Sequence, residues 1–244
     1  MSSGKSRLDV ALVERGLFDS REKARRAVMA AQVLVNGQAL TKAGTPVSPD
    51  ARLEVVAKEK YVGRGGFKIE GALDAFAIDP AGRICADIGA STGGFTDCLL
   101  QRGAVQVFAF DVGHGQLDWR LRQDPRVIVR EGVNARYLGP GDLEPPPTLV
   151  VADVSFISLT LIFPAIFALL PLESDMVVLI KPQFELSKAE VGRGGIVRDE
   201  AARVRAVEKI RTFIAQSGHR WMGCIPSPIT GRDGNVEFLA HLKP

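Results

Sequence analysis

Four charged residues stand beside apolar or glycine-rich segments, where they could perform acid–base chemistry. Asp153 follows the run LVVA, and Lys181 follows MVVLI. Lys68 comes after a double glycine, and Glu237 interrupts the alternating pattern VEFLAHL, which would place it on the opposite strand face. A charge at the end of a buried strand costs free energy unless it is paired. Each residue alone is typical of a strand end that reaches solvent, whereas two amines and two carboxylates in one crevice could exchange protons.

A second group of residues is typical of a loop that binds a nucleoside. The segment DIGASTGGF, residues 87–95, follows one apolar run, and Asp111 ends the next. Glycines let the backbone approach a ligand closely where a helix begins, and a carboxylate on the following strand can accept both hydroxyls of a ribose. Because the loop carries an acid and no phosphate-binding lysine, it favours a positively charged sulfonium cofactor over a pyrophosphate. The alternative interpretation is an ordinary tight turn between a strand and a helix.

Alternating strands and helices must position these residues, and the hydrophobic pattern predicts such a scaffold. After a helix with the apolar stripe Ile69, Ala72, Leu73 and Phe76, strands are expected at 84–88, 105–111, 126–130, 149–153 and 176–181. Helices are expected at 93–102, 159–170 and 199–217. Two last strands, near 221–225 and 235–242, favour an antiparallel hairpin. This alternation predicts an α/β fold with a largely parallel sheet covered on both faces, and ligands beyond the carboxyl ends of its strands.

The first quarter of the chain is a basic module of different character. Residues 1–60 hold eleven Lys/Arg against seven Asp/Glu, whereas the whole chain has a net charge of +3. A helix is expected to begin at Asp19 or Ser20, which are good N-caps, with the apolar face Ala24, Ala27, Val28 and Ala31. A short strand VLV and an Asn-Gly turn follow. The module suggests an arm that binds a polyanion, and the alternative is a solvated basic helix face.

The cysteines and the apolar segments of the sequence indicate the cellular compartment. Cys85, Cys98 and Cys224 are far apart and have no metal-ligand spacing, which favours a reducing compartment over a disulfide framework or a zinc site. The first residues contain no apolar signal segment, and the longest apolar run is interrupted by Pro164 and Pro171. We therefore expect a cytoplasmic protein without a bound metal.

The N-terminal motifs resemble the S-four-type RNA-binding domain. The resemblance rests on SREKARRAV, VLVNG and a following strand, in this order. It implies that the basic helix lies along an RNA phosphate backbone, which gives affinity with little sequence discrimination. The expected RNA contacts are Arg7, Arg21, Lys23, Arg25, Arg26 and Arg64, with Arg193 and Arg198 in a later loop that could equally be a mobile surface segment.

The four charged residues resemble the K-D-K-E tetrad of FtsJ-like RNA ribose methyltransferases. With the segments RGGFK, DIGASTGGFTDCLL, NAR, DVSFISL and GGIVRD, the chain resembles the TlyA, or haemolysin A, family. The resemblance implies 2′-O-methylation of cytidine in ribosomal RNA with S-adenosylmethionine as cofactor. It also implies a Rossmann-like class I methyltransferase fold, with a mostly parallel seven-stranded sheet that closes in an antiparallel hairpin, and a small N-terminal α+β domain. The expected boundaries are 1–58 for the RNA-binding domain, 59–62 for a linker and 63–244 for the methyltransferase domain.

The resemblance assigns roles to the site residues. Lys181 is the candidate base for the ribose hydroxyl, because burial and the neighbouring Lys68 both disfavour the charged form of a lysine. Asp153 and Glu237 would orient the two amines. The expected cofactor contacts are Asp87, Gly89, Ala90, Ser91, Thr92, Gly93, Gly94, Phe95, Asp111, Glu131 and Asn134. The family often carries Arg-x-Trp-Val between its domains, whereas this chain reads Glu59-Lys60-Tyr61-Val62.

Two other classes of function stay open at this point. A non-catalytic RNA-binding factor of ribosome assembly would keep the N-terminal module, but the presence of all four tetrad residues disfavours it. A pore-forming haemolysin, as the older family name suggests, would need a membrane-active segment. The sequence shows no strongly amphipathic cationic helix of the usual length.

Overall fold

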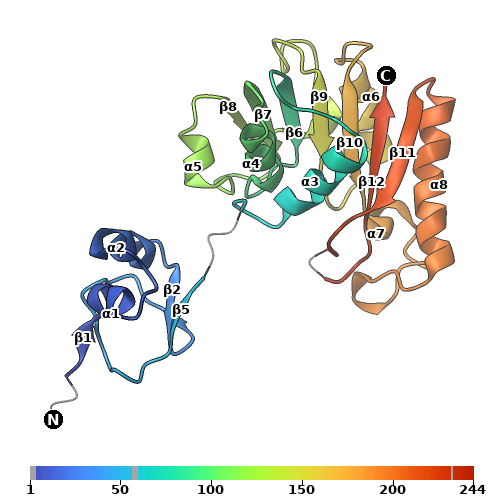
Figure 1. Ribbon diagram of the computed structural model, residues 1–244. Coiled ribbons are helices and arrows are strands. Elements are labelled where there is room, and N and C mark those ends of the chain that lie inside the picture. The colour runs from blue at the N-terminus through green and yellow to red at the C-terminus, as the bar shows by residue number, and fades with distance from the viewer. Residues whose placement is uncertain (1–3, 57–59, 232) are drawn as a thin grey trace. The chain divides into compact units, whose positions relative to one another are not determined.

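The computed structural model describes residues 4–56, 60–231 and 233–244, and the chain forms two compact units, Met1–Glu59 and Lys60–Pro244 (Figure 1). Each unit has its own hydrophobic core. The core of the first unit is small and centres on Leu8, Leu12 and Val28. The larger unit holds two cores, one on each face of its sheet.

The N-terminal unit packs two short helices beside two small sheets. The helices are α1 (Leu8–Glu14) and α2 (Arg21–Met29). One antiparallel pair joins β1 (Ser6–Arg7) to β4 (Pro46–Val47), and β2 (Val33–Val35) pairs with both β3 (Gln38–Ala39) and β5 (Leu53–Val55). Of the two predicted N-cap candidates, Asp19 and Ser20, the N-cap is Ser20, whose hydroxyl accepts from the amide of Lys23.

One detail of the predicted helix is wrong. Ala31 does not extend the apolar face, because α2 already ends at Met29 and Ala31 is exposed with a φ of 55°. The amides of Ala31 and Gln32 donate to the carbonyls of Val28 and Ala27. These bonds close the helix in a left-handed turn, which redirects the chain into β2.

The larger unit is built on a seven-stranded sheet in the order β11-β12-β10-β9-β6-β7-β8. Its strands are β6 (Ile84–Ile88), β7 (Gln106–Asp111), β8 (Val127–Glu131), β9 (Leu149–Ala152), β10 (Asp175–Ile180), β11 (Arg220–Pro226) and β12 (Phe238–Lys243). The five strands from β6 to β10 pair in parallel, and β12 is antiparallel to both β10 and β11. The predicted fold class and its closing hairpin are confirmed.

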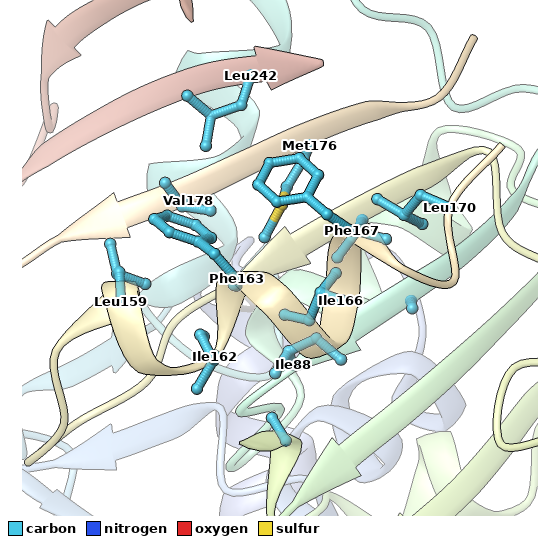
Figure 2. Packing of buried hydrophobic residues seen from close by; sticks show 14 of the residues in the cluster. Ile88, Leu159, Ile162, Phe163, Ile166, Phe167, Leu170, Met176, Val178 and Leu242 are labelled. Atoms are coloured by element: carbon cyan, nitrogen blue, oxygen red, sulfur yellow. The ribbon is translucent and has the colours of Figure 1, made fainter. Parts of the chain in front are cut away.

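Helices cover both faces of this sheet, as the alternation of side chains along its strands requires. In β10, Met176 and Val178 face one core, and Val177 faces the other. The first core packs on α6 (Phe163–Phe167) and α8 (Glu200–Gln216), and Figure 2 shows its aromatic centre around Phe163. The second packs on α3 (Gly65–Ala75), α4 (Gly94–Gln101) and α5 (Trp119–Arg122). One further helix, α7 (Pro182–Glu185), directly follows β10.

Two predicted elements of this unit have different bounds. Residues 159–170 do not form one helix but a 3-10 turn, Leu159–Leu161, followed by α6, which has Pro164 in its first turn. Proline lacks the amide that a continuous helix would need there. The last strand begins at Phe238 rather than at Asn235, so Glu237 precedes the strand. Asn235 is held away from the sheet, because its side chain bonds the amide of Val197 and the carbonyl of Gly195.

The segment that departs from the family pattern is anchored in the larger unit. Glu59 lies outside the described residues, but Tyr61 is only 3% exposed and packs edge-on against Phe67, with ring centroids 5.3 Å apart. The Tyr61 hydroxyl contacts the Cys98 thiol at 3.5 Å, and the amide of Val62 donates to Asp97 at 2.8 Å. A side chain at Gly66 would collide with the Tyr61 ring. The aromatic ring at this position therefore fixes the start of α3 against α4.

Replacement of Tyr61 should test this anchor. Tyr61→Ala empties a buried aromatic site, and we expect it to lower the free energy of unfolding by about 3 kcal/mol. Chemical denaturation of the full chain measures the change. The matched control is Tyr137→Ala, since Tyr137 is 75% exposed and its loss should be nearly neutral. Equal stability of the two variants would contradict an anchoring role.

Candidate active site

The four charged residues predicted from the sequence form two ion pairs. Lys181 Nζ lies 2.6 Å from Asp153 Oδ1, and Lys68 Nζ lies 2.5 Å from Glu237 Oε2. Ile180 pairs with Phe238 across the antiparallel strands β10 and β12, so Lys181 and Glu237 take the next opposite positions. The acids and amines therefore meet at one edge of the sheet, where the parallel strands end. Each lysine has a carboxylate partner, which offsets the cost of removing its charge from water.

The two pairs differ in their access to solvent. In the Lys68–Glu237 pair the side chains are 9% and 4% exposed, whereas in the Lys181–Asp153 pair they are 11% and 22% exposed. Gly231 contributes to the burial of Glu237, because a side chain at Gly231 would fall 2.5 Å from the Glu237 carboxylate. Lys181 has a second partner, since its Nζ donates to the Ser155 hydroxyl at 2.8 Å. The more open pair is therefore the one that a substrate could reach.

A cavity of about 460 Å³ lies beside the open pair, at the carboxyl ends of β6, β7 and β9. Its apolar walls include Ile88, Phe110, Val133, Ile157 and Ile162. The polar residues along it include Ser91, Asp111, Gln116, Asn134, Asp153 and Ser155. A cavity with apolar walls and several polar groups among them is typical of a small-molecule pocket.

Asp111 is held in this cavity by the backbone of two loops. Its Oδ2 accepts from the amide of Ser91 at 2.8 Å, and its Oδ1 accepts from the amide of Gly113 at 2.7 Å. Each carboxylate oxygen has a second lone pair, so both can still accept from a ligand. Gly89 has a φ of 88°, and a side chain there would collide with the carbonyl of Asp153. This close approach brings the glycine-rich loop against the segment that carries the acid of the open pair.

The predicted cofactor contacts divide into two groups. Gly89, Ser91, Asp111 and Asn134 line the cavity, whereas the other seven do not: Asp87, Ala90, Thr92, Gly93, Gly94, Phe95 and Glu131. Glu131 instead accepts from the amide of Gly115 at 2.9 Å and pairs with Arg122. The glycines of the loop have packing roles, because a side chain at Gly93 would meet Leu121, and one at Gly94 would meet the backbone around Gly66.

Several cavity residues were not predicted from the sequence. Gln116, Val133, Ser155 and Ile157 line the cavity from loops whose course the hydrophobic pattern does not specify. Phe156 also lines the cavity, and it is 91% exposed with a φ of 63°. A bulky residue in the left-handed region is rare and often marks a functional site. No sequence signal predicts this backbone angle. An aromatic residue three positions after a predicted catalytic acid could nevertheless have drawn attention to the position.

The basic residues of the N-terminal unit have two different environments. Arg7 and Arg21 both bond the buried carboxylate of Asp9, at 3.0 and 3.1 Å, and the Arg7 guanidinium holds the pKa of that carboxyl at about 2. Lys23 pairs with Asp19 at 2.7 Å, and Arg26 lies 4.0 Å from Glu22. Arg25 is exposed on the same helix. Arg7 and Arg21 therefore stabilise the fold of this unit as well as presenting positive charge.

The remaining predicted RNA contacts belong to the larger unit. Arg64 is exposed at the start of α3, the helix that carries Lys68. Arg198 is exposed in the loop that leads into α8. The backbone of Arg193 lies in a short 3-10 turn, and its side chain is outside the described part of the structure.

Comparison with known proteins shows the family. Residues 61–244 match the model described as FtsJ-like methyltransferase, and residues 6–53 match the S4 domain. The chain is 46% identical to "16S/23S rRNA (cytidine-2'-O)-methyltransferase TlyA" of Mycobacterium tuberculosis (strain ATCC 25618 / H37Rv), over 98% of this chain and 90% of that protein. The chain belongs to the TlyA family of FtsJ-like methyltransferases.

Two further relatives can be aligned with almost the full length of this TlyA-family chain. It is 50% identical to the protein YqxC of Bacillus subtilis (strain 168), over 99% of this chain and 87% of that protein. A solved structure from Streptococcus thermophilus is 43% identical, with a TM-score of 0.75, and the match covers 99% of this chain and 89% of that one. The S4 and methyltransferase units are therefore present together in their expected order.

The buried carboxyl of Asp87, at the start of the glycine-rich loop, should make the stability of the fold depend on pH. Burial raises the pKa of this carboxyl to about 7, and its Oδ2 accepts from the amide and hydroxyl of Thr96 at 2.9 and 2.7 Å. A raised folded-state pKa means that stability is lost as the pH rises from about 4 to about 7. Asp87→Asn removes this titration. We expect the variant to gain on the order of 4 kcal/mol relative to the wild type between pH 4 and pH 8.

Chemical denaturation of both proteins across this pH range measures the difference. Asp79→Asn is the control, because it makes the same substitution in the Asp79–Ala81 turn, where the carboxylate bonds an exposed backbone amide. A pH-independent stability difference between Asp87→Asn and the wild type would contradict the raised pKa.

Proposed function

We propose that this chain transfers a methyl group from S-adenosylmethionine to the 2′-hydroxyl of a cytidine ribose in ribosomal RNA. The observation that supports this most directly is the open Lys181–Asp153 pair beside the cavity. The relative from M. tuberculosis, which carries the activity in its name, supports the choice of ribosomal RNA and cytidine. The reaction is proposed to take place in the cytoplasm.

The residues along the cavity fit S-adenosylmethionine. Asp111 would accept the ribose hydroxyls with the oxygen lone pairs that the loop amides leave free. Ile88, Phe110 and Ile157 offer an apolar surface for the adenine ring, and Asn134 adds a polar group at the rim. Gly89 brings the loop backbone close to the ligand. The cofactor supplies a methyl group on a positively charged sulfur, which is activated for attack by an oxygen nucleophile.

The chain's own contribution is to position the hydroxyl and remove its proton. A ribose hydroxyl is a weak nucleophile, so a base must take its proton as the oxygen attacks. Lys181 is proposed as this base, with Asp153 and Ser155 holding its Nζ at a fixed place beside the cavity. Glu237 holds the charge of Lys68 in the more buried pair, whereas the partners of Lys181, Asp153 and Ser155, line the cavity, so Lys181 is the amine beside the proposed cofactor.

The N-terminal unit is proposed to supply RNA affinity. It matches the S4 domain, and α2 presents Arg25 and Arg26 on its exposed side. We propose the domain boundaries at 1–58, 59–62 and 63–244. The anchoring of Tyr61 and Val62 in the larger unit suggests that the second half of this linker belongs structurally to the catalytic part.

The other functions considered from the sequence have less support. A purely RNA-binding assembly factor would have no use for a cavity that is lined by Asp111 and lies beside the open Lys181–Asp153 pair. For a haemolysin, the described helices offer no candidate for a membrane span, since none is both long and apolar enough. Transfer of tritium from labelled S-adenosylmethionine to ribosomal RNA separates these functions.

Substitution of Lys181 tests the proposed base. Lys181→Ala should lower the single-turnover rate of methyl transfer by ~10²–10⁴-fold, while cofactor and RNA affinity stay unchanged. Lys181→Arg is more selective, because arginine keeps the positive charge but does not release its proton near neutral pH. It should be as inactive as the alanine variant. The control is Lys188→Arg, the same change at an exposed lysine of the following loop. A rate near that of the wild type in Lys181→Arg would show that Lys181 acts only through its charge.

The role of the N-terminal helix is tested by its salt dependence. The variant Arg25→Ala/Arg26→Ala should bind ribosomal RNA more weakly, with a log–log salt slope reduced by roughly one unit for each lost phosphate contact. Arg21 is left in place, since its removal would weaken the pairing of the buried Asp9 carboxylate. Binding of S-adenosylmethionine should be unaffected. Arg211→Ala, on α8, removes a comparable exposed charge as the control. An unchanged slope in the double variant would mean that the helix face is merely solvated.

A further inference from the structure

Glu185 is a buried carboxylate that the proposed mechanism does not use. It lies at the end of α7, four residues after Lys181, and its side chain is only 1% exposed. Its Oε2 accepts from the Ser158 hydroxyl at 2.5 Å, and its Oε1 accepts from the amide of Leu159 at 2.8 Å. Lys209 of α8 completes the cluster, since its Nζ donates to Oε2 at 3.2 Å and to the Glu185 carbonyl at 2.7 Å.

These bonds connect the same two segments that the open ion pair connects. Lys181 and Glu185 belong to one segment, and Asp153, Ser155 and Ser158 belong to the other. In the first set of contacts, Lys181 Nζ pairs with Asp153 and donates to Ser155. In the second set, the Glu185 carboxylate bonds Ser158 and Leu159, at the end of the loop that carries Asp153 and Ser155. The loop between these points contains the exposed Phe156 with its φ of 63°. Its apolar contacts are those of Val154 and Ile157 with the first core and of Phe156 with Phe184 of α7, and the hydrogen bonds of Glu185 add to them at the end of the loop.

The burial of the Glu185 carboxylate favours keeping its hydrogen bonds intact. A buried carboxylate is costly unless its oxygens are bonded, and here an amide, a hydroxyl and an ammonium group all donate to it. The amide belongs to Leu159, the first residue of the 3-10 turn Leu159–Leu161, so the carboxylate also fixes the start of this turn. The bonds of Glu185 are therefore mutually supporting, and their geometry leaves the loop from 153 to 158 little freedom.

We propose that Glu185 is a positioning residue, which holds the loop 153–158 against α7 so that Asp153 and Ser155 keep the Lys181 amine in place. The inference deepens the proposed methyl transfer and rests on it. Glu185 lines neither the cavity nor the open ion pair, so it acts through Lys181, Asp153 and Ser155. An outer residue of this kind typically changes a rate by 10- to 100-fold when it is replaced.

Glu185→Gln is the central variant, because it keeps the shape of the side chain and removes its charge and part of its accepting capacity. In full-length protein with saturating S-adenosylmethionine and ribosomal RNA, we expect the single-turnover rate to fall roughly 10- to 100-fold. The dissociation constants of both ligands should change by less than about twofold, since the cavity and the N-terminal unit are untouched. Amide hydrogen exchange in residues 153–159 should become faster, which is a readout independent of activity.

The matched control is Glu190→Gln. Glu190 is likewise a carboxylate with several donors, from Ser187 and Arg205, but none of these donors belongs to the loop 153–158. This variant should retain the wild-type rate and the wild-type exchange in that loop. Ser158→Ala removes the hydroxyl that donates to Glu185, accepts from Lys209 and caps the 3-10 turn, but it leaves the Glu185 carboxylate bonded to Leu159 and Lys209, and it serves if Glu185→Gln does not fold. Its loss of rate should be smaller, and it should add almost nothing in the Glu185→Gln background.

The outcomes separate this inference from the proposed function. If the wild type transfers no methyl group, the proposed function fails, and the exchange data still decide whether Glu185 holds the loop. If Glu185→Gln loses stability but keeps the rate and the loop protection of the wild type, Glu185 only supports the fold and the inference is overturned. Equal losses of rate and of ligand affinity would also overturn it, because they would indicate general disruption of the site.

Discussion

Two lysine charges at the edge of an apolar sheet must be compensated, and much of the site geometry follows from this constraint. The strands that end at Asp153 and Lys181 are buried on both faces, so their terminal charges meet little water. The compensation is a carboxylate for each amine, from neighbouring strand ends. Because the two acids lie on different elements, the pairs differ in exposure. The two amines themselves are about equally buried, and Lys181 is distinguished by its partners Asp153 and Ser155, which line the cavity.

Hydrogen bonds from the backbone have a comparable role around the cavity. Amides of two loops fix the carboxylate of Asp111, and the close approach of Gly89 to Asp153 connects the cavity to the open ion pair. In the N-terminal unit, a buried aspartate fixes two of the basic residues. Positive charge there takes part in folding, so a substitution of Arg7 or Arg21 has to be chosen with the buried Asp9 carboxylate in view.

The sequence by itself determined the order of the elements, because the periods of apolar residues follow directly from helix and strand geometry. It predicted the sheet, its closing hairpin and an N-cap at Asp19 or Ser20, of which the structure has Ser20. It also predicted that Asp153 and Lys181 stand at strand ends, since each directly follows an apolar run. Such features are local, and a charge or a cap residue next to an apolar pattern is sufficient to predict them.

Only the tertiary structure decided which of these residues meet. The pairing of Lys68 with Glu237 joins groups 169 positions apart in the chain, and no local pattern specifies that distance. The same holds for Glu131, which pairs with Arg122 away from the cavity, although it ends the strand beside Asp111. The bonds of Glu185 to another loop are also invisible in the sequence. The physical reason is that side-chain partners across a sheet depend on strand order and loop paths, which the packing of the whole unit determines.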